Sequence, residues 1–236
     1  MAGCLLMLGT ACTKIDNYDG PNARLSGTIT DKSTGDPFIL DQGGISLRMW
    51  ETSWSDTPAP RDIAVRADGT YNNTKLFKGT YSILPYSGAF WPTTDTIKGF
   101  DLTGNNTLDF ELTPYLHVTD VSYELVGENR DQLSITCRLH APIAEGMPNV
   151  VEIRPFLSFT KFCGAGNRID YYFKDEYKIG LNRAWSDIGD ANGMSNTFTI
   201  PNLPLDKGKV YRFRVGVQIN NSFSSWNYSK IYEIAP

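Results

Sequence analysis

Apolar and polar residues alternate with a period of two along much of the chain. Clear examples in the first half are residues 25–29, 45–49 and 108–112, where apolar residues or glycine alternate with polar neighbours. Successive side chains of a β-strand point to opposite faces, so this pattern predicts half-buried strands. Glycine, serine and aspartate cluster between the strands, as in residues 33–36 and 67–70, which predicts tight turns.

The second half repeats this organisation after a break at Pro114. Its alternating segments are residues 133–139, 151–153, 198–200, 211–219 and 232–234. Proline cannot donate to a strand ladder, so we expect one sheet to end at Pro114. No segment shows a long period of 3.6, and only short helical turns are expected, around residues 182–189. The sequence therefore predicts an all-β chain of two tandem antiparallel β-sandwiches, over residues 23–114 and 115–236.

The motifs of both halves resemble known β-sandwich families. Residues 23–113 resemble the carboxypeptidase-regulatory, transthyretin-like domain, and the resemblance lies in the segments LSGTITD (25–31), TGDP (34–37), ADGTY (67–71) and LFKGTYS (76–82). Residues 115–236 resemble a fibronectin type III or immunoglobulin-like domain, most clearly in FTIPNLPLDKGKVYRFRV (198–215). That resemblance implies a tyrosine corner at Tyr211, with its hydroxyl bonded to upstream backbone. The chain departs from the pattern at Cys137, where a core tryptophan is often found.

The first residues indicate export and lipidation. Residues 4–11 are apolar or small, and Cys12 follows directly. The run is too short to cross a bilayer but suits a signal peptide. The residues before Cys12 resemble a bacterial lipobox, which implies a signal peptide over residues 1–11, lipid on Cys12 and a polar tether over residues 12–22. Gly9 stands where a lipobox usually has leucine, and the alternatives are a plain secretory signal or a buried N-terminal strand.

The lipobox-like start, the lead-in NYDGPNA (17–23) and the two sandwiches together cover nearly the whole chain. They resemble a Bacteroidetes outer-membrane lipoprotein family of unknown function that is associated with glycan-uptake systems. The resemblance implies a lipid-anchored protein of the outer membrane, at the cell surface, that is accessory to polysaccharide capture or uptake. Its implied partners are an oligosaccharide and outer-membrane glycan-uptake proteins, and its implied contact with the membrane is the lipid anchor alone.

Charge and cysteine content narrow the range of partners. The chain has 22 Lys and Arg against 26 Asp and Glu, a net charge of −4, and no basic block. A basic block is what nucleic-acid phosphates or anionic lipids would require, so neither partner is expected. Cys137 and Cys163 remain once Cys4 leaves with the signal and Cys12 is lipidated. An exported pair could form a disulfide, but the position of Cys137 within a predicted strand favours a buried free thiol.

The sequence carries no catalytic or metal-binding motif. His117 and His140 lack the spacing of metal ligands, and we interpret both as ordinary strand residues. A GxSxG nucleophile motif is absent. Residues 187–193 invite comparison with a calcium loop, but Ile188 stands where the first ligand would be needed. We therefore expect no enzymatic activity, no cofactor and no metal.

Tryptophans beside polar residues are the best candidates for a ligand site. An aromatic ring can cover the apolar face of a sugar while neighbouring polar groups meet its hydroxyls. Trp185 and Trp226 lie in segments of this composition, and Trp54 and Trp91 are the next candidates. Simple packing is the alternative for each ring, because most tryptophans are largely buried. We predict a non-catalytic protein that binds glycan or docks on an uptake complex; the alternative is a purely structural or adhesive surface module.

Overall fold

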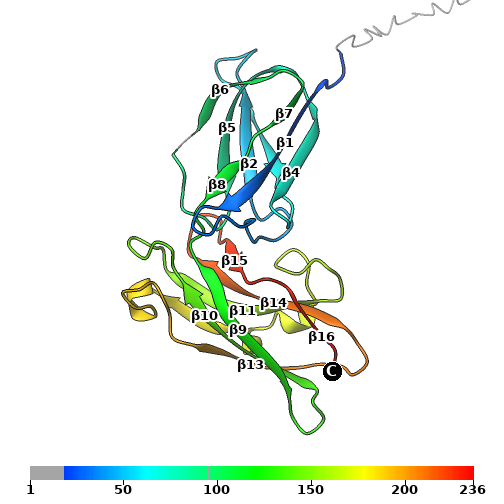
Figure 1. Ribbon diagram of the computed structural model, residues 1–236, viewed down its shortest axis with the longest axis vertical. Coiled ribbons are helices and arrows are strands. Elements are labelled where there is room, and N and C mark those ends of the chain that lie inside the picture. Colours follow the sequence, from blue (N-terminus) through cyan, green and yellow to red (C-terminus); the bar gives the residue numbers. More distant parts are fainter. Residues whose placement is uncertain (1–18, 95) are drawn as a thin grey trace, which may run out of the picture.

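The computed structural model describes residues 19–94 and 96–236 and shows two β domains arranged end to end (Figure 1). The strands of the first domain are β1 (Ala23–Asp31), β2 (Ser46–Glu51), β3 (Pro60–Ala64), β4 (Thr70–Leu76), β5 (Gly79–Ser87), β6 (Ile97–Leu102), β7 (Asn105–Thr107) and β8 (Phe110–Leu112). One sheet has the order β4-β1-β7, with β8 also paired to β1, and the other has the order β3-β2-β5-β6. Strand β1 runs from the far end of this domain to the junction with the second domain (Figure 1).

The second domain begins directly after the junction. Its strands are β9 (His117–Val126), β10 (Gln132–His140), β11 (Val150–Ser158), β12 (Ile179–Arg183), β13 (Phe198–Pro204), β14 (Tyr211–Ile219), β15 (Trp226–Tyr228) and β16 (Tyr232–Ile234). They form sheets of order β13-β10-β9 and β12-β11-β14-β15, with β16 also paired to β14. The 3-10 turns η1 (Asp170–Tyr172), η2 (Asp175–Tyr177) and η3 (Trp185–Asp187) interrupt the long connections. Among the described residues, no helix is long and apolar enough to cross a membrane.

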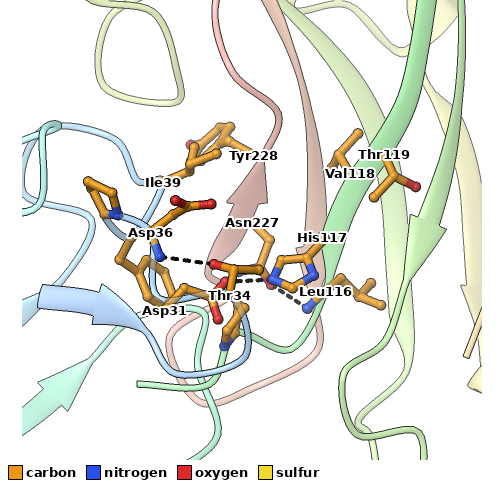
Figure 2. A pocket seen from close by; sticks show the side chains of 13 residues that line it. Asp31, Thr34, Asp36, Ile39, Leu116, His117, Val118, Thr119, Asn227 and Tyr228 are labelled. Atoms are coloured by element: carbon orange, nitrogen blue, oxygen red, sulfur yellow. Dashed lines mark hydrogen bonds and ion pairs between the residues drawn. The ribbon is translucent and has the colours of Figure 1, made fainter. Parts of the chain in front are cut away.

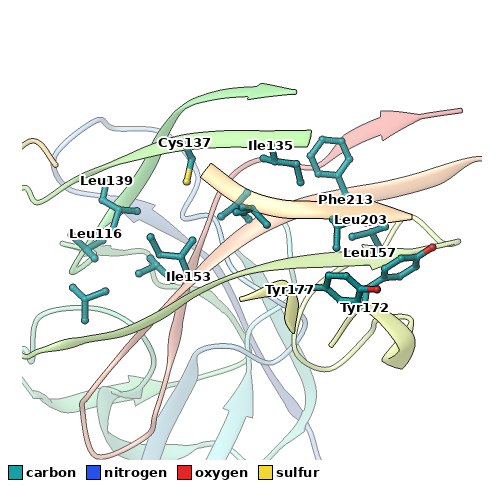
Figure 3. Close-up of a cluster of buried hydrophobic side chains, with 14 of the residues drawn as sticks. Leu116, Ile135, Cys137, Leu139, Ile153, Leu157, Tyr172, Tyr177, Leu203 and Phe213 are labelled. Carbon is teal, nitrogen blue, oxygen red and sulfur yellow. The ribbon is translucent and has the colours of Figure 1, made fainter. Parts of the chain in front are cut away.

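Each domain has its own hydrophobic core, as alternation requires. In β10 the residues Leu133, Ile135, Cys137 and Leu139 are fully buried between polar neighbours that are less buried. They pack with residues of the facing sheet, such as Phe213 of β14, in the cluster of Figure 3. Burying a leucine or isoleucine side chain stabilises a fold by about 1.5–3 kcal/mol. A separate cluster around β1, β2 and β5 forms the core of the first domain.

The tyrosine corner lies where the second resemblance placed it. Tyr211 is buried at the start of β14, and its hydroxyl accepts a hydrogen bond from the backbone N–H of Asp206 at 3.0 Å. The hydroxyl therefore satisfies a backbone donor in the connection from β13. The corner fixes how the chain enters β14, the central strand of its sheet.

The structure confirms the predicted all-β fold of two sandwiches and the short helical turn near residues 182–189. Cys137 and Cys163 are both buried and free, which confirms the expectation of a free Cys137. Among the strand pairings of the described residues, β1 pairs in parallel with β7 and β8, and the other pairings are antiparallel as expected. The proposed lipid-bearing residue, Cys12, lies outside the described residues.

Candidate functional site

Buried polar side chains join the two domains. Asp41, in the connection between β1 and β2, accepts a hydrogen bond from the backbone N–H of Gly166 at 2.7 Å. Its carboxylate also lies 3.4 Å from Nη2 of Arg214, whose Nη1 donates to the carbonyl of Leu40 at 3.0 Å. Gly164 permits this approach, because a Cβ there would lie 2.3 Å from Nη2 of Arg214. We refer to this group of contacts around Asp41 and Arg214 as the latch.

Two asparagines make a second connection across the junction. The side-chain amide of Asn227, a buried residue of β15, donates to the carbonyl of Ala89 at 2.7 Å. The amide oxygen of Asn227 accepts from the backbone N–H of Leu116 at 3.1 Å. Asn221 likewise donates to the carbonyl of Gly88 at 3.1 Å. Side chains that bond to the backbone of the other domain allow few alternative arrangements of the two domains. The hollows between the domains, described next, are therefore largely preformed.

Asp31 and His117 line one hollow of about 230 Å³ (Figure 2) and belong to a chain of ionisable groups. Nε2 of His117 lies 2.6 Å from Oδ2 of Asp31, which belongs to the other domain. Nδ1 of His117 lies 3.3 Å from Nδ1 of His140, so one of the two nitrogens must donate to the other. Burial, and next the neighbouring His117, lower the pKa of His140. The histidines do lie on strands, as expected, but they also form part of an interdomain hydrogen-bond chain.

Two larger hollows, of about 560 and 480 Å³, share Gly88 and Phe223 in their walls. Both are lined by residues of the two domains, and we refer to them together as the junction groove. The first domain contributes the end of β5 and the connections around Gln42 and Phe90. The second domain contributes residues 221–225, which connect β14 to β15, together with Trp226 of β15, Ala165 and Gly166.

Aromatic rings in the junction groove face solvent. Tyr86 is 39% exposed and Phe223 is 44% exposed, and they meet edge to face with ring centroids 5.2 Å apart. Trp226 is partly exposed and packs at 90° against Phe156, with centroids 5.1 Å apart. Serine and asparagine side chains of residues 221–225 lie beside these rings. The groove therefore combines apolar ring surface with hydrogen-bonding groups, as small-molecule sites do.

Local hydrogen bonds hold the rings of the groove in place. The amide oxygen of Asn221 accepts from the backbone N–H groups of Phe223 at 3.2 Å and Ser225 at 3.1 Å, which fixes the loop that presents Phe223. The guanidinium of Arg48 lies 3.4 Å above the ring of Tyr86. Arg48 is itself held by two hydrogen bonds of 2.8 Å to Asp62, and these lower the pKa of the Asp62 carboxyl. A ring positioned in this way loses little freedom when a ligand stacks on it.

The four tryptophans predicted from the sequence lie in different places. Trp226 lines the junction groove. Trp185 is only 5% exposed and packs in the core under Gly189, so the expectation that its ring is a ligand platform is wrong. Trp91 is partly buried and packs against Tyr115, with centroids 5.1 Å apart. Trp54 is 83% exposed, away from the groove, and its indole N–H donates to Glu51.

The polar residues near Trp185 are used within their own loop. One carboxylate oxygen of Asp190 accepts from the backbone N–H groups of Asn192 and Met194, each at 2.9 Å. These bonds lower the pKa of the Asp190 carboxyl and close a turn. Across residues 19–94 and 96–236, no group of three or more His, Cys, Asp or Glu side chains is placed to hold a metal ion.

Comparison with known proteins identifies the family. Solved structures with the same fold include a Bacteroides uniformis protein provisionally described as carbohydrate binding, which is 23% identical with a TM-score of 0.71 and covers 92% of this chain and 100% of its own. A second protein from Bacteroides uniformis, of the DUF3823 family, is 23% identical with a TM-score of 0.72 and covers 91% of this chain and 99% of its own. A DUF3823 protein from Parabacteroides merdae is 19% identical with a TM-score of 0.65 and covers 92% of this chain and 100% of its own.

Family models extend this similarity from fold to sequence. A search of curated proteins finds no match. The model described as the N-terminal domain of a protein of unknown function, DUF3823, matches residues 23–113. The model described as a domain of unknown function, the DUF3823 C-terminal domain, matches residues 116–233. The two matches lie on either side of the junction that carries the groove, and the chain therefore belongs to the DUF3823 family.

Proposed function

We propose that this protein is a non-catalytic, glycan-binding lipoprotein of the bacterial outer membrane, and that it holds an oligosaccharide in the junction groove. The observation that carries the proposal is the exposed pair of Tyr86 and Phe223, with Trp226 beside it, in a groove preformed by two domains. Sugars have flat C–H faces that stack on aromatic rings and hydroxyl edges that need hydrogen bonds. The serine hydroxyls of residues 222–225 supply such groups next to the rings.

The groove favours binding over cleavage. Glycosidases use two carboxyl groups that flank the scissile bond, about 5–10 Å apart. Among the described residues that line the groove, Asp41 is the only one with a carboxylate. That carboxylate is buried and already bonded to Gly166 and paired with Arg214. Its function in the latch leaves it unsuited to protonate a leaving group, which supports a non-catalytic site.

The lining of the groove also indicates the charge of its ligand. Lysine and arginine are absent from the described residues that line it. Arg48, which lies over the Tyr86 ring, is already paired with Asp62. An acidic sugar would therefore lose hydration in the groove without gaining an unpaired cation as a partner, at a net cost. We therefore propose a neutral oligosaccharide as the ligand.

The proposed location rests on the N-terminal sequence and on the family. The residues before Cys12 resemble a lipobox, and the polar residues 13–22 suit a tether between an anchor and the first strand. The solved relative from Bacteroides uniformis that is provisionally described as carbohydrate binding supports the choice of ligand. Lipidation is tested by feeding cells a fatty-acid probe, which should label the parent protein but not the Cys12→Ala variant. Equal labelling of both would contradict this part of the proposal.

Glycan binding is tested by calorimetric titration of the unlipidated Cys12→Ser protein with neutral oligosaccharides: cellohexaose, xylohexaose, mannohexaose and maltoheptaose. Phe223→Ala removes an exposed ring from a loop and should weaken binding by about 1–3 kcal/mol, the usual contribution of an anchor residue. Trp226→Ala should act in the same direction. Trp54→Ala is the matched control, because it removes an exposed ring outside the groove. Binding that depends on Trp54 but not on Phe223 would place the site elsewhere.

A second candidate function is docking on a protein partner, as a structural or adhesive surface module. Ile39, Phe162 and Ile231 are exposed around another hollow of about 230 Å³ at the junction. Clustered exposed apolar side chains mark protein-binding surfaces. This function becomes the better proposal if none of the oligosaccharides binds the parent protein.

A further inference from the structure

A separate hollow of about 420 Å³ lies in the second domain, at the start of β14. Its walls come from Phe159, directly after β11, from η1 and from the connection between β13 and β14. The core residues Ile169, Tyr172, Leu205 and Tyr211 form its inner side. The junction groove lies at the other end of β14, beyond Ile219. The eight steps from Tyr211 to Ile219 place the two sites roughly 25 Å apart at a strand rise of about 3.3 Å per residue.

Two aromatic residues at this hollow are half exposed. Phe159 is 50% exposed, and its ring rests on the buried ring of Tyr211 with centroids 5.1 Å apart. Tyr171 is 49% exposed and meets Tyr172 edge to face, with centroids 5.0 Å apart. The hydroxyl of Tyr172 donates to the carbonyl of Pro204 at 2.8 Å. Each exposed ring therefore has a fixed ring behind it, so its position is set before any ligand arrives.

The rim of the hollow offers a donor and an acceptor close together. Nζ of Lys209 lies 2.6 Å from Oδ2 of Asp206, and it also lies 5.6 Å from the centroid of Phe159. Both charged groups are well exposed. A sugar with adjacent hydroxyls can accept from the ammonium and donate to the carboxylate while its C–H face covers Phe159. The two charges balance each other, which favours a neutral sugar.

The geometry points to a second sugar-binding site in this hollow, with Phe159 as its stacking surface and the pair of Asp206 and Lys209 as its polar contacts. This inference rests on the proposed glycan-binding function and adds to it a second point of contact with the same neutral class of ligand. Two sites on one chain, one between the domains and one within the second domain, can hold two parts of one long polysaccharide. The protein then holds the polysaccharide more tightly than either site alone would, since the second contact forms at high effective concentration.

The test is the number of oligosaccharide molecules bound per chain, measured by calorimetric titration of the Cys12→Ser protein with the panel given above. The parent should bind two molecules of the oligosaccharide that binds. Phe159→Ala should lose one of them, with affinity at that site reduced about tenfold or more, and Phe223→Ala should lose the other. Phe162→Ala is the matched control, because it removes an exposed phenylalanine three residues away that lines a different hollow. Phe159→Trp should keep both sites, and its fluorescence should change on binding.

The outcomes separate this inference from the proposal on which it rests. One bound molecule that is lost with Phe223→Ala and unaffected by Phe159→Ala would overturn the second site and leave the groove intact. Equal losses in Phe159→Ala and Phe162→Ala would overturn the assignment of Phe159. Binding of none of the panel by the parent would overturn both proposals. Unchanged thermal unfolding of Phe159→Ala is required for a loss of binding to count in favour of the site.

Discussion

A single hydroxyl stabilises the entry to β14. Tyr211→Phe removes the acceptor for the backbone N–H of Asp206 and leaves that donor in a partly buried turn. We expect the free energy of unfolding of the second domain to fall by about 0.5–1.5 kcal/mol, the net value of one hydrogen bond. Urea denaturation followed by fluorescence measures it. Tyr123→Phe, at a ring that is partly exposed, is the control, and equal stability of parent and Tyr211→Phe would mean that the corner bond contributes nothing.

The two buried thiols should be inert in the folded protein. Burial raises the pKa of Cys137 to about 12 and that of Cys163 to about 12. The thiolate is the reactive form, so both residues should resist a thiol reagent at neutral pH. A Cys4→Ser, Cys12→Ser protein treated with Ellman's reagent should show no rapid labelling until denaturant is added. Rapid labelling of one thiol in the native protein would contradict the buried placement.

At the scale of elements, the connection between β11 and η1 forms the latch through Gly164. A methyl group at this position would lie 2.3 Å from Nη2 of Arg214 and 2.6 Å from Cγ of Asp41. Gly164→Ala should therefore separate these groups and cost roughly 1–3 kcal/mol, as overpacking of a tight site does. Differential scanning calorimetry measures the effect. Gly180→Ala is the control, since a Cβ there meets nothing within 4 Å, and it should unfold like the parent.

The local sequence predicted individual strands but not the contacts between distant parts of the chain. The alternation of apolar and polar residues predicted β10 and β14, because each strand places every second side chain in the hydrophobic core. The local sequence is enough to indicate such a strand. The pairing of β1 with β7 and β8 joins residues about 80 positions apart, and no local pattern encodes it. The same limit applies to the histidines. The bond between Asp31 and His117 connects two domains, so spacing along the chain could not indicate it.

The candidate groove was predictable only in part. Phe223 and Trp226 lie in one short segment rich in polar residues, and that composition singled out Trp226. Tyr86 reaches the same groove from the other domain, so only the fold brings it next to Phe223. Trp185 had equally polar neighbours, yet its ring is buried, because the short η3 turn directs it into the core. Composition alone does not determine which way a side chain points.

For the whole molecule, we expect acid to destabilise the fold through His140, which contacts the interdomain residue His117. The folded protein lowers the pKa of His140 below its ordinary value of 6.5, so the unfolded chain takes up this proton more readily. The contribution of His140 to stability is therefore fully present above about pH 6.5 and is lost as the pH falls through the folded pKa. We expect the midpoint of urea unfolding to decrease between about pH 7 and pH 5.

His140→Gln separates this contribution from the general effect of acid. Glutamine can bond to His117 but does not take up a proton, so this variant should show a smaller decrease in the midpoint over the same range. The hydrogen bonds from Arg48 lower the pKa of the Asp62 carboxyl, so its titration lies at lower pH and should affect both proteins alike. Identical pH profiles for parent and variant would mean that His140 does not control the junction in this range.

The direction of β1 sets the distance between the N-terminal end of the first domain and the junction groove. This strand begins at Ala23, at the end of the molecule remote from the junction, and finishes at Asp31 beside the second domain (Figure 1). Its nine residues span roughly 30 Å at the usual rise of a strand. A surface that holds the chain by its N-terminal side therefore has a rigid spacer one domain long between itself and the groove. Under the proposed function, polymers too bulky to approach that surface closely would still reach Phe223.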